Sequence, residues 1–390
     1  MKRMAMILSV LFCMALATGC GPSTDEPSKP TDHDTKSYDL ERYMAPLWSG
    51  DIVYNETVLP LSDRFGEAQE IQLLYDATEI ISVRNGTLDT KMPESTYELR
   101  DGKLLVKKQS GMLMRYEDYY LDKPNFDLIH LPSISKKGKY LVYQEGNFFH
   151  NRQLAVTYRH SGGTELTAPE KKGDLLPKTM KKLKDGENFN LVLYGDSISV
   201  GANASDYFEV NANPHTPIWG KMLCEALEAR SDCEIAFDNS LSKGGEYGCT
   251  YGVNPGNLEK LNAMEPDLLI IGFGMNDKDH YTKEKFAEAI RTIMESVSSA
   301  NPDCEFILVS SWLANPDITI SPAGNDRIRE YREEMLKMET TGVAVADVTS
   351  MHEQLLQRKR YMDMTGNNVN HPNDFTTRMY AQVVNECLKD

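Results

Sequence analysis

Residues 191–201 read Leu-Val-Leu-Tyr-Gly-Asp-Ser-Ile-Ser-Val-Gly, an apolar run that stops at a Gly-Asp-Ser corner. Such a run is typical of a buried strand, and a polar side chain after it points out over the carboxyl edge of a sheet, where ligands bind. Gly195 lets the chain turn, and Ser197 would then stand at the N-terminus of a helix. The backbone N–H groups at such a terminus can face a negative charge that develops during a reaction. The stretch predicts a nucleophilic serine at the end of a strand. The alternative is an ordinary turn with a helix-capping serine.

Apolar runs and helical patterns alternate from this stretch to the C-terminus. Residues 286–297 place apolar side chains at helical spacing, and residues 328–338 do the same before Gly342. Thr216 followed by Pro217 predicts the capped start of a helix after the first strand. Strands that alternate with helices in this way form a parallel sheet covered on both faces. Four more apolar runs of strand length follow the first, at 233–237, 267–273, 306–309 and 343–346.

Polar blocks recur at the ends of these predicted strands and before the last helix. There are four, in this order: Gly-Asp-Ser at 195–197, Asn239 with Gly244, Asn276, and His371. Together they resemble the blocks of the SGNH hydrolase superfamily, which is also called GDSL. The resemblance covers about residues 188–390. It implies an α/β fold, a flavodoxin-like three-layer α/β/α SGNH hydrolase domain.

The chemistry of ester hydrolysis explains these residue types. A serine hydroxyl needs a base within hydrogen-bond reach, and the resemblance implies Ser197 as the nucleophile and His371 as its base. Attack on a carbonyl creates an oxyanion, which needs donors that are already in place. The resemblance implies an oxyanion hole made by the backbone N–H groups of Ser197 and Gly244 and the side-chain amide of Asn276.

One block departs from the family pattern. The family usually has an aspartate three residues before the histidine, where this chain has Asn368. An asparagine carbonyl can still accept the Nδ1–H of the histidine, so Asn368 is the predicted third catalytic residue. A backbone carbonyl, Asp363 and Asp347 are alternatives that the sequence leaves open. With a neutral group in this role, the site would work as a Ser-His pair.

Residues 38–177 follow a different, β-like pattern. Short apolar runs alternate with turns, and Asp-Gly at 101–102 lies between two such runs and predicts a hairpin. Several short strands with turn signals between them predict an all-β sandwich, here jelly-roll-like. Five aromatic residues are interpreted as core residues, with a sugar-stacking surface as the alternative: Trp48, Tyr119, Tyr120, Phe148 and Phe149. The hydrolase domain is predicted to span residues 186–390.

The first 37 residues are predicted to lie outside both domains. Residues 1–19 have a positive start and an apolar stretch too short for a comfortable membrane span. Small residues directly before Cys20 resemble a bacterial lipoprotein signal, which implies that Cys20 becomes the lipidated first residue of the mature chain. The alternative is a plain secretory peptide cut near Ala17. Residues 20–37 have the composition of a flexible tether.

Composition and motifs argue against several classes of function. The formal net charge of −16 argues against a nucleic-acid partner, because a nucleic-acid backbone needs a basic face. The sequence has no metal-ligand spacing, phosphate-binding loop or nicotinamide motif, so no cofactor or metal is predicted. Five cysteines remain after Cys13 and Cys20, and they are interpreted as small buried residues. A disulfide between Cys224 and Cys233 stays open.

These features predict an exported serine esterase, lipid-anchored through Cys20 to the bacterial cell envelope at the periplasmic or surface face of the outer membrane. A β-sandwich ahead of this catalytic domain is similar to several carbohydrate esterase families, which remove acetyl groups from polysaccharides. That similarity implies an acetylated poly- or oligosaccharide as the substrate. The alternatives are a lipid or general carboxylester hydrolase, and a non-catalytic glycan-binding surface lipoprotein.

Overall fold

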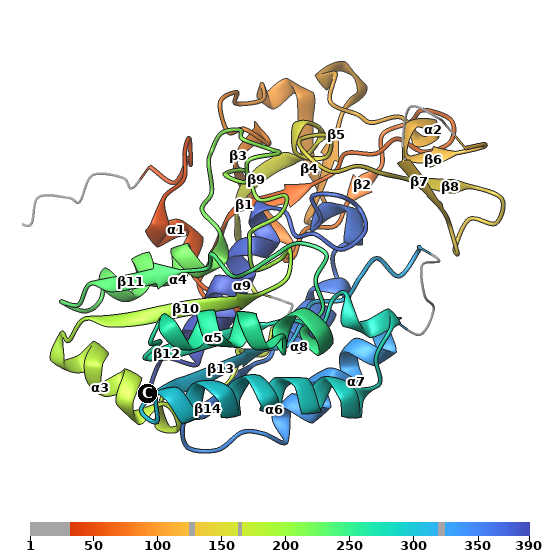
Figure 1. Ribbon diagram of the computed structural model, residues 1–390. Coiled ribbons are helices and arrows are strands. Elements are labelled where there is room, and N and C mark those ends of the chain that lie inside the picture. Colours follow the sequence, from red (N-terminus) through yellow and green to blue (C-terminus); the bar gives the residue numbers. More distant parts are fainter. Residues whose placement is uncertain (1–31, 125–128, 163–165, 319–323) are drawn as a thin grey trace, which may run out of the picture. The chain divides into compact units, whose positions relative to one another are not determined.

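The computed structural model describes residues 32–124, 129–162, 166–318 and 324–390. Residues 34–390 form one unit by their contacts. Within this unit, antiparallel strands come first along the chain, and a parallel sheet with flanking helices follows (Figure 1). We call residues 34–162 the antiparallel part and residues 166–390 the parallel part. The mixed fold class is therefore the predicted one, while the predicted boundaries at residues 177 and 186 remain predictions.

The parallel part contains a five-stranded sheet in which every pair of neighbouring strands is parallel. The strand order is β11-β10-β12-β13-β14, so the first strand in sequence lies between the second and the third. The order reverses at β10, and ligands of such sheets bind beyond the carboxyl ends of the strands at this point. All five predicted strands are confirmed, with ends that differ by up to two residues. They are β10 (Phe189–Gly195), β11 (Ile235–Asp238), β12 (Leu268–Gly272), β13 (Glu305–Val309) and β14 (Val343–Ala346).

Helices cover both faces of this sheet (Figure 1). Side chains alternate along β10, so Leu191 and Leu193 join the apolar cluster of α4 and α9, while Val192 and Tyr194 join that of α6 and α7. None of these four side chains is more than 2% exposed. Burial on both faces explains why the strand is a continuous apolar run. The helices are α3 (Pro177–Asp185), α4 (Trp219–Glu228), α5 (Pro255–Ala263), α6 (Lys283–Ala300), α7 (Gly324–Leu336), α8 (Val348–Leu356) and α9 (Asp374–Glu386).

The described residues of the antiparallel part form three three-stranded sheets, with orders β1-β9-β3, β2-β5-β4 and β6-β8-β7. The predicted hairpin joins β4 to β5, and both turn residues, Asp101 and Gly102, have the positive φ that a tight hairpin turn needs. Tyr119 and Phe149 are buried, as the core interpretation predicts, while Trp48, Tyr120 and Phe148 are half-buried and pack against apolar clusters. The elements are α1 (Leu40–Met44), β1 (Ile52–Val58), β2 (Glu70–Ile71), β3 (Ala77–Asn85), β4 (Tyr97–Arg100), β5 (Lys103–Val106), α2 (Tyr116–Tyr119), β6 (Tyr120–Leu121), β7 (Ile129–Pro132), β8 (Tyr140–Tyr143) and β9 (Leu154–His160).

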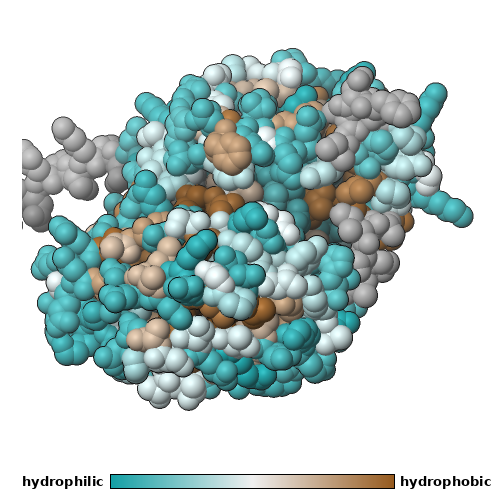
Figure 2. Space-filling model, in the orientation of Figure 1, coloured by the Kyte–Doolittle hydropathy of each residue, from teal (hydrophilic) through white to brown (hydrophobic). Residues whose placement is uncertain are grey.

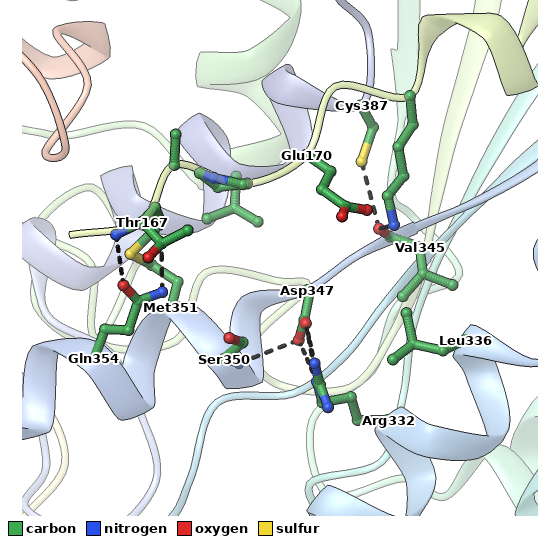
Figure 3. Close-up of a pocket in the computed structure, with 14 residues that line it drawn as sticks. Thr167, Glu170, Arg332, Leu336, Val345, Asp347, Ser350, Met351, Gln354 and Cys387 are labelled. Atoms are coloured by element: carbon green, nitrogen blue, oxygen red, sulfur yellow. Dashed lines mark hydrogen bonds and ion pairs between the residues drawn. The ribbon is translucent and has the colours of Figure 1, made fainter.

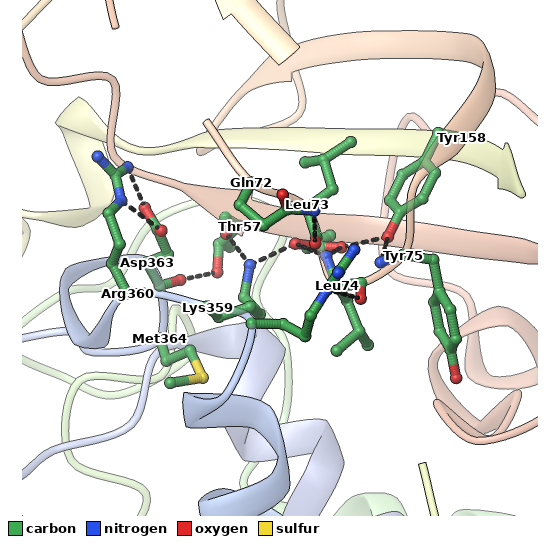
Figure 4. A network of polar contacts seen from close by, with 12 residues as sticks. Thr57, Gln72, Leu73, Leu74, Tyr75, Tyr158, Lys359, Arg360, Asp363 and Met364 are labelled. Atoms are coloured by element: carbon green, nitrogen blue, oxygen red, sulfur yellow. Dashed lines mark hydrogen bonds and ion pairs between the residues drawn. The ribbon is translucent and has the colours of Figure 1, made fainter. Parts of the chain in front are cut away.

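A buried ion pair joins the two parts (Figure 4). Lys359, which follows α8, donates to Glu56 of β1, and neither side chain has any exposed surface. Glu56 also accepts from the backbone N–H of Leu74 at 3.0 Å and from the hydroxyl of Tyr158 at 2.7 Å. The ammonium group of Lys359 donates in addition to the carbonyl of Thr57 at 3.0 Å. One apolar cluster also contains residues of both parts, so charge and burial together hold the parts against each other.

Several local predictions have clear outcomes. Thr216 does not cap α4, because the helix begins three residues later, at Trp219; its hydroxyl donates instead to Asp374 at 3.0 Å. Cys224 and Cys233 are free and buried, as are the other three described cysteines, so the open disulfide does not form. Cys20 and the predicted targeting segment lie outside the described residues. Within the described ranges, no helix combines the length and the apolar character needed to cross a membrane.

Candidate active site

Ser197 lies just after β10, on a corner that requires glycine at its start. A Cβ on Gly195 would lie 2.1 Å from the Oγ of Ser199 and 2.5 Å from the carbonyl oxygen of Gly272, so no side chain fits there. The predicted helix after Ser197 does not form. The residues that follow make consecutive turns, and Gly201 adopts a φ of +78°, which an α-helix does not contain. The serine is 7% exposed and is held on this corner without a helix.

His371 faces Ser197 from the loop before α9. Its Nε2 lies 2.9 Å from the Oγ of Ser197. The loop is fixed through its backbone, because the hydroxyl of Thr365 donates to the carbonyl of His371 at 2.9 Å and the side-chain oxygen of Asn367 accepts the N–H of His371 at 3.0 Å. The fold thus brings together the predicted nucleophile and the predicted base, which are 174 residues apart in the sequence.

Two side chains that the sequence analysis did not identify contact the other ring nitrogen of His371. The Oε2 of Glu145 lies 3.0 Å from Nδ1, and the Oδ1 of Asn203 lies 2.8 Å from it. The amide of Asn203 is oriented by its own donors, because its Nδ2 points to the carbonyl oxygens of Gly146 at 3.2 Å and Gly366 at 3.4 Å. Both acceptors favour the tautomer with the proton on Nδ1. Nε2 is then free to take the proton of the serine.

The prediction that Asn368 orients His371 is corrected by these contacts. The side-chain oxygen of Asn368 accepts from the hydroxyl of Tyr119 at 2.9 Å and from the amide of Asn315 at 3.1 Å. Its amide donates to the carbonyl of Val142 in β8 at 2.9 Å. Asn368 is therefore a link between the loop before α9 and the antiparallel part, and the geometry gives it no bond to the imidazole.

The carboxylates that the sequence left open as orienting groups also have other partners. Asp363 pairs with Arg360 and accepts the N–H of Leu59 at 2.7 Å. Asp347 pairs with Arg332 and caps α8. Since the side chains of Glu145 and Asn203 occupy the acceptor position at Nδ1, neither Asn368 nor any of the three alternatives from the sequence takes that place.

The loops after β11 and β12 carry two of the three predicted oxyanion donors, Gly244 and Asn276. A Cβ on Gly244 would lie 3.7 Å from the Cβ of Ser197, so the loop after β11 passes close to the nucleophile. The side-chain amide of Asn276 donates to the carbonyl of Glu246 at 2.9 Å, which joins the loop after β12 to the loop after β11. The predicted donors therefore lie on two connected loops at the carboxyl edge of the sheet, one of them directly beside the serine.

Comparisons with known proteins agree with this arrangement. Residues 193–377 match the model of the GDSL-like Lipase/Acylhydrolase family, a range that includes Ser197, Gly244, Asn276 and His371 but not Glu145. The chain carries a GDSL-like lipase/acylhydrolase domain. This GDSL-like domain supports an esterase as the general function of the chain. No curated protein matches the sequence.

Several solved structures are similar to about half of this chain at low identity. A two-domain esterase active on acetylated mannans, co-crystallized with mannopentaose, is 21% identical with a TM-score of 0.42, over 56% of this chain and only 53% of that one. A putative GDSL-like lipase from Parabacteroides merdae is 18% identical with a TM-score of 0.40, over 52% of this chain and 96% of that one. A mutant acetyl-xylooligosaccharide esterase from Geobacillus is 17% identical with a TM-score of 0.40, over 50% of this chain and 92% of that one.

Two buried aspartates support the loops of the GDSL-like domain. Burial raises the pKa of Asp196 to about 7, although the N–H of Ile198 bonds to its carboxyl group at 3.0 Å and opposes the change. Burial also raises the pKa of Asp277, against the N–H groups of Gly248 and Cys249, which donate to it at 2.9 Å each. These bonds brace the loops that contain the two aspartates.

Glu145 shows the opposite balance. Burial acts to raise its pKa, but the hydrogen bonds and charge of its neighbours outweigh burial and lower the pKa overall. Its Oε2 faces His371, while its Oε1 accepts from the hydroxyl of Tyr143 at 2.7 Å and the amide of Asn367 at 3.0 Å. The carboxyl group is therefore ionised at neutral pH, and a negative charge stands beside the imidazole.

A cavity of about 440 Å³ opens beside Asn276 and is lined mostly by polar and charged residues. Hydrophilic residues also cover most of the surface drawn in Figure 2, where hydrophobic ones show mainly in the band between the upper and lower halves. Ile134, from the antiparallel part, is 51% exposed and forms one wall of the cavity. The polar lining consists of Asn276, Lys278, Asp279, Asn315, Asn325, Asp326, Arg329 and Asn370.

A second cavity, of about 340 Å³, lies between the chain before α3 and the helices α7, α8 and α9 (Figure 3). None of the predicted site residues lines it. Two of its charged side chains are paired, because Arg332 binds Asp347 and Lys172 binds Glu339. The contact between a nucleophile and a base lies at Ser197 and not in this cavity.

Proposed function

We propose that the chain hydrolyses O-acetyl esters on carbohydrates with Ser197 as the nucleophile and His371 as the base. The observation that carries the proposal is the 2.9 Å contact between the Oγ of Ser197 and the Nε2 of His371. As the Oγ attacks the acyl carbon, its proton passes to Nε2, and the same proton then leaves with the sugar hydroxyl. Water, activated by the same nitrogen, releases acetate from the acyl-enzyme.

The tetrahedral oxyanion would be stabilised by three donors. These are the backbone N–H groups of Ser197 and Gly244 and the side-chain amide of Asn276. The close approach of Gly244 to Ser197 and the bond that ties Asn276 to the neighbouring loop support these roles. Donors held in place before the reaction cost no reorganisation when the charge develops.

The character of the cavity beside Asn276 supports a hydroxyl-rich substrate over a long acyl chain. A fatty acyl group is best accommodated by an apolar pocket, since its stabilisation comes from burying apolar surface. The lining contains amide, carboxylate, ammonium and guanidinium groups, and they match the donors and acceptors of a sugar. The apolar part of the lining consists of Ile134, Ala314, Pro316, Ile318 and Val369.

The test is the hydrolysis of matched substrates by the wild type and by Ser197→Ala. We expect acetate release from acetylated mannan or xylan oligosaccharides, and faster cleavage of p-nitrophenyl acetate than of p-nitrophenyl octanoate. Preference for octanoate, with no acetate from the glycans, would identify a lipid or general carboxylester hydrolase. Binding of the glycans without any Ser197-dependent hydrolysis would identify a non-catalytic glycan-binding protein.

We also propose that the mature chain is exported and held at the cell envelope by lipid on Cys20. The support for this proposal comes from the sequence alone. A positively charged start is followed by an apolar stretch, and small residues stand directly before this cysteine. A glycan-directed esterase acts where its polymer is accessible, so this location agrees with the proposed substrate.

A further inference from the structure

We propose that Glu145 of the antiparallel part positions His371 and stabilises its protonated form, so that both parts of the chain build one active site. The inference rests on the proposed ester hydrolysis. It assigns the third role to a residue outside the range that matches the family model, which begins at residue 193. The antiparallel part is then a component of the catalytic machinery rather than only a neighbour of it.

The two oxygens of Glu145 have separate tasks. Oε1 is held by the hydroxyl of Tyr143 at 2.7 Å and by the amide of Asn367 at 3.0 Å. This leaves Oε2 for the Nδ1 of His371 at 3.0 Å. Because the side chain is anchored at one oxygen, the other keeps its place at the imidazole although a third of the side chain is exposed.

Glu145 and Asn203 contribute different effects at the same nitrogen. The oxygen of Asn203 is a neutral acceptor, and it keeps the proton on Nδ1 even when Glu145 is replaced. Only Glu145 brings a negative charge, which interacts favourably with the imidazolium that forms when Ser197 gives up its proton. Loss of the charge should therefore slow the chemical step while the tautomer is retained.

Asn368 explains how the chain does without the usual aspartate. Its amide donates to the carbonyl of Val142 in β8, and its oxygen accepts from Tyr119, so it attaches the loop of His371 to the strand that precedes Glu145. The N–H of Gln144 also donates to the carbonyl of Asn367 at 3.3 Å. In the family this position usually holds the aspartate that contacts the histidine. In this chain Asn368 instead holds the antiparallel part in place, so that Glu145 reaches the imidazole.

The decisive experiment measures Ser197 directly as well as ester hydrolysis, in the full mature chain. A fluorophosphonate probe forms a bond between the Oγ of Ser197 and phosphorus, fluoride leaves, and the serine proton goes to His371. For Glu145→Gln we expect both the labelling rate and kcat to fall about 10²-fold with KM little changed. The loss is smaller than the about 10⁴-fold effect seen when the only acceptor at Nδ1 is lost, because Asn203 remains.

Two further variants separate positioning from a general effect. Glu145→Asp keeps the charge on a shorter side chain, and should react at least tenfold faster than Glu145→Gln yet more slowly than the wild type. Glu209→Gln removes a charge from the neighbouring loop, whose backbone lies beside Gly146, without touching the imidazole. We expect this control to stay within twofold of the wild type.

The outcomes distinguish this inference from the proposed function. Glu145-dependent labelling of Ser197 in a chain that cleaves no ester would support the inference and overturn the proposed function. Wild-type labelling in Glu145→Gln, or equal losses in Glu145→Gln and Glu209→Gln, would overturn the inference. The inference would also be overturned if the probe did not label Ser197 in the wild type. If Glu145→Gln does not fold by circular dichroism, Glu145→Asp decides: slower labelling supports the inference and an unchanged rate overturns it.

Discussion

Replacing Lys359 by Met should destabilise the chain by about 3 kcal/mol. Both side chains of the Lys359–Glu56 pair have 0% exposure, so the substitution leaves a buried carboxylate without its cation. Breaking a buried pair on one side typically costs about 3–5 kcal/mol. The lower end applies here, because Glu56 keeps the N–H of Leu74 and the hydroxyl of Tyr158 as donors. Met fills a volume similar to that of Lys, so the cavity contribution is small.

The assay is urea unfolding of the mature chain, followed by tryptophan fluorescence and by far-ultraviolet circular dichroism. Coincident transitions would justify a single free energy of unfolding. The double variant Glu56→Gln/Lys359→Met removes both charges, and should lie within about 1 kcal/mol of the wild type. An exposed pair, Lys285 with Glu288 in α6, supplies the control, because Lys285→Met should cost at most about 0.5 kcal/mol.

Two results would refute this reasoning. If the free energy of unfolding of Lys359→Met lies within about 0.5 kcal/mol of the wild-type value, which is the range typical of surface substitutions, Glu56 does not need its cation. The single variant Glu56→Gln completes the cycle. If the loss of stability in the double variant equals the sum of the losses in Lys359→Met and Glu56→Gln, the two groups are not coupled and the network in Figure 4 does not stabilise the chain as a unit.

Three further predictions concern the site, its pH dependence and the anchor. Ser197→Ala should lower kcat by several orders of magnitude with an unchanged circular dichroism spectrum, and Asn276→Ala should lower it by about 10²–10³; activity close to that of the wild type in the first variant would mean that another serine reacts. The pKa of Asp196 is about 7 in the fold against 3.8 for the free group, so the folded chain holds the extra proton between these values and its stability should fall as pH rises through this window, by on the order of 4 kcal/mol. Asp196→Asn should flatten that part of a plot of unfolding free energy against pH, and an unchanged slope would contradict the assignment. Cys20→Ala should move the exported chain from the membrane to the soluble fraction, and retention at the membrane would rule out the lipid anchor.

Short-range patterns account for most of the parallel part. The predicted and observed bounds of the strand at 343–346 are identical. A strand that is buried on both faces consists of apolar residues only, so the apolar run marks its ends. The Asp-Gly hairpin followed equally from backbone chemistry, since few residues tolerate the positive φ that the turn needs. Thr216 is not a cap because α4 begins three residues later, at Trp219, and the Thr216 hydroxyl donates to the distant Asp374. Local propensity is a weak guide to where a helix begins.

The same division holds for the site. By itself the sequence determined the succession of strands and helices along the chain and the blocks that carry Ser197, Gly244, Asn276 and His371, because these depend on neighbouring residues. Only the tertiary structure decided what stands at the Nδ1 of His371. Glu145 lies 226 residues away in the sequence, and it reaches the imidazole because the antiparallel part packs against the loop before α9. No periodicity or spacing along a chain encodes such a contact, which depends on how two separately patterned regions bury surface and pair charges against each other.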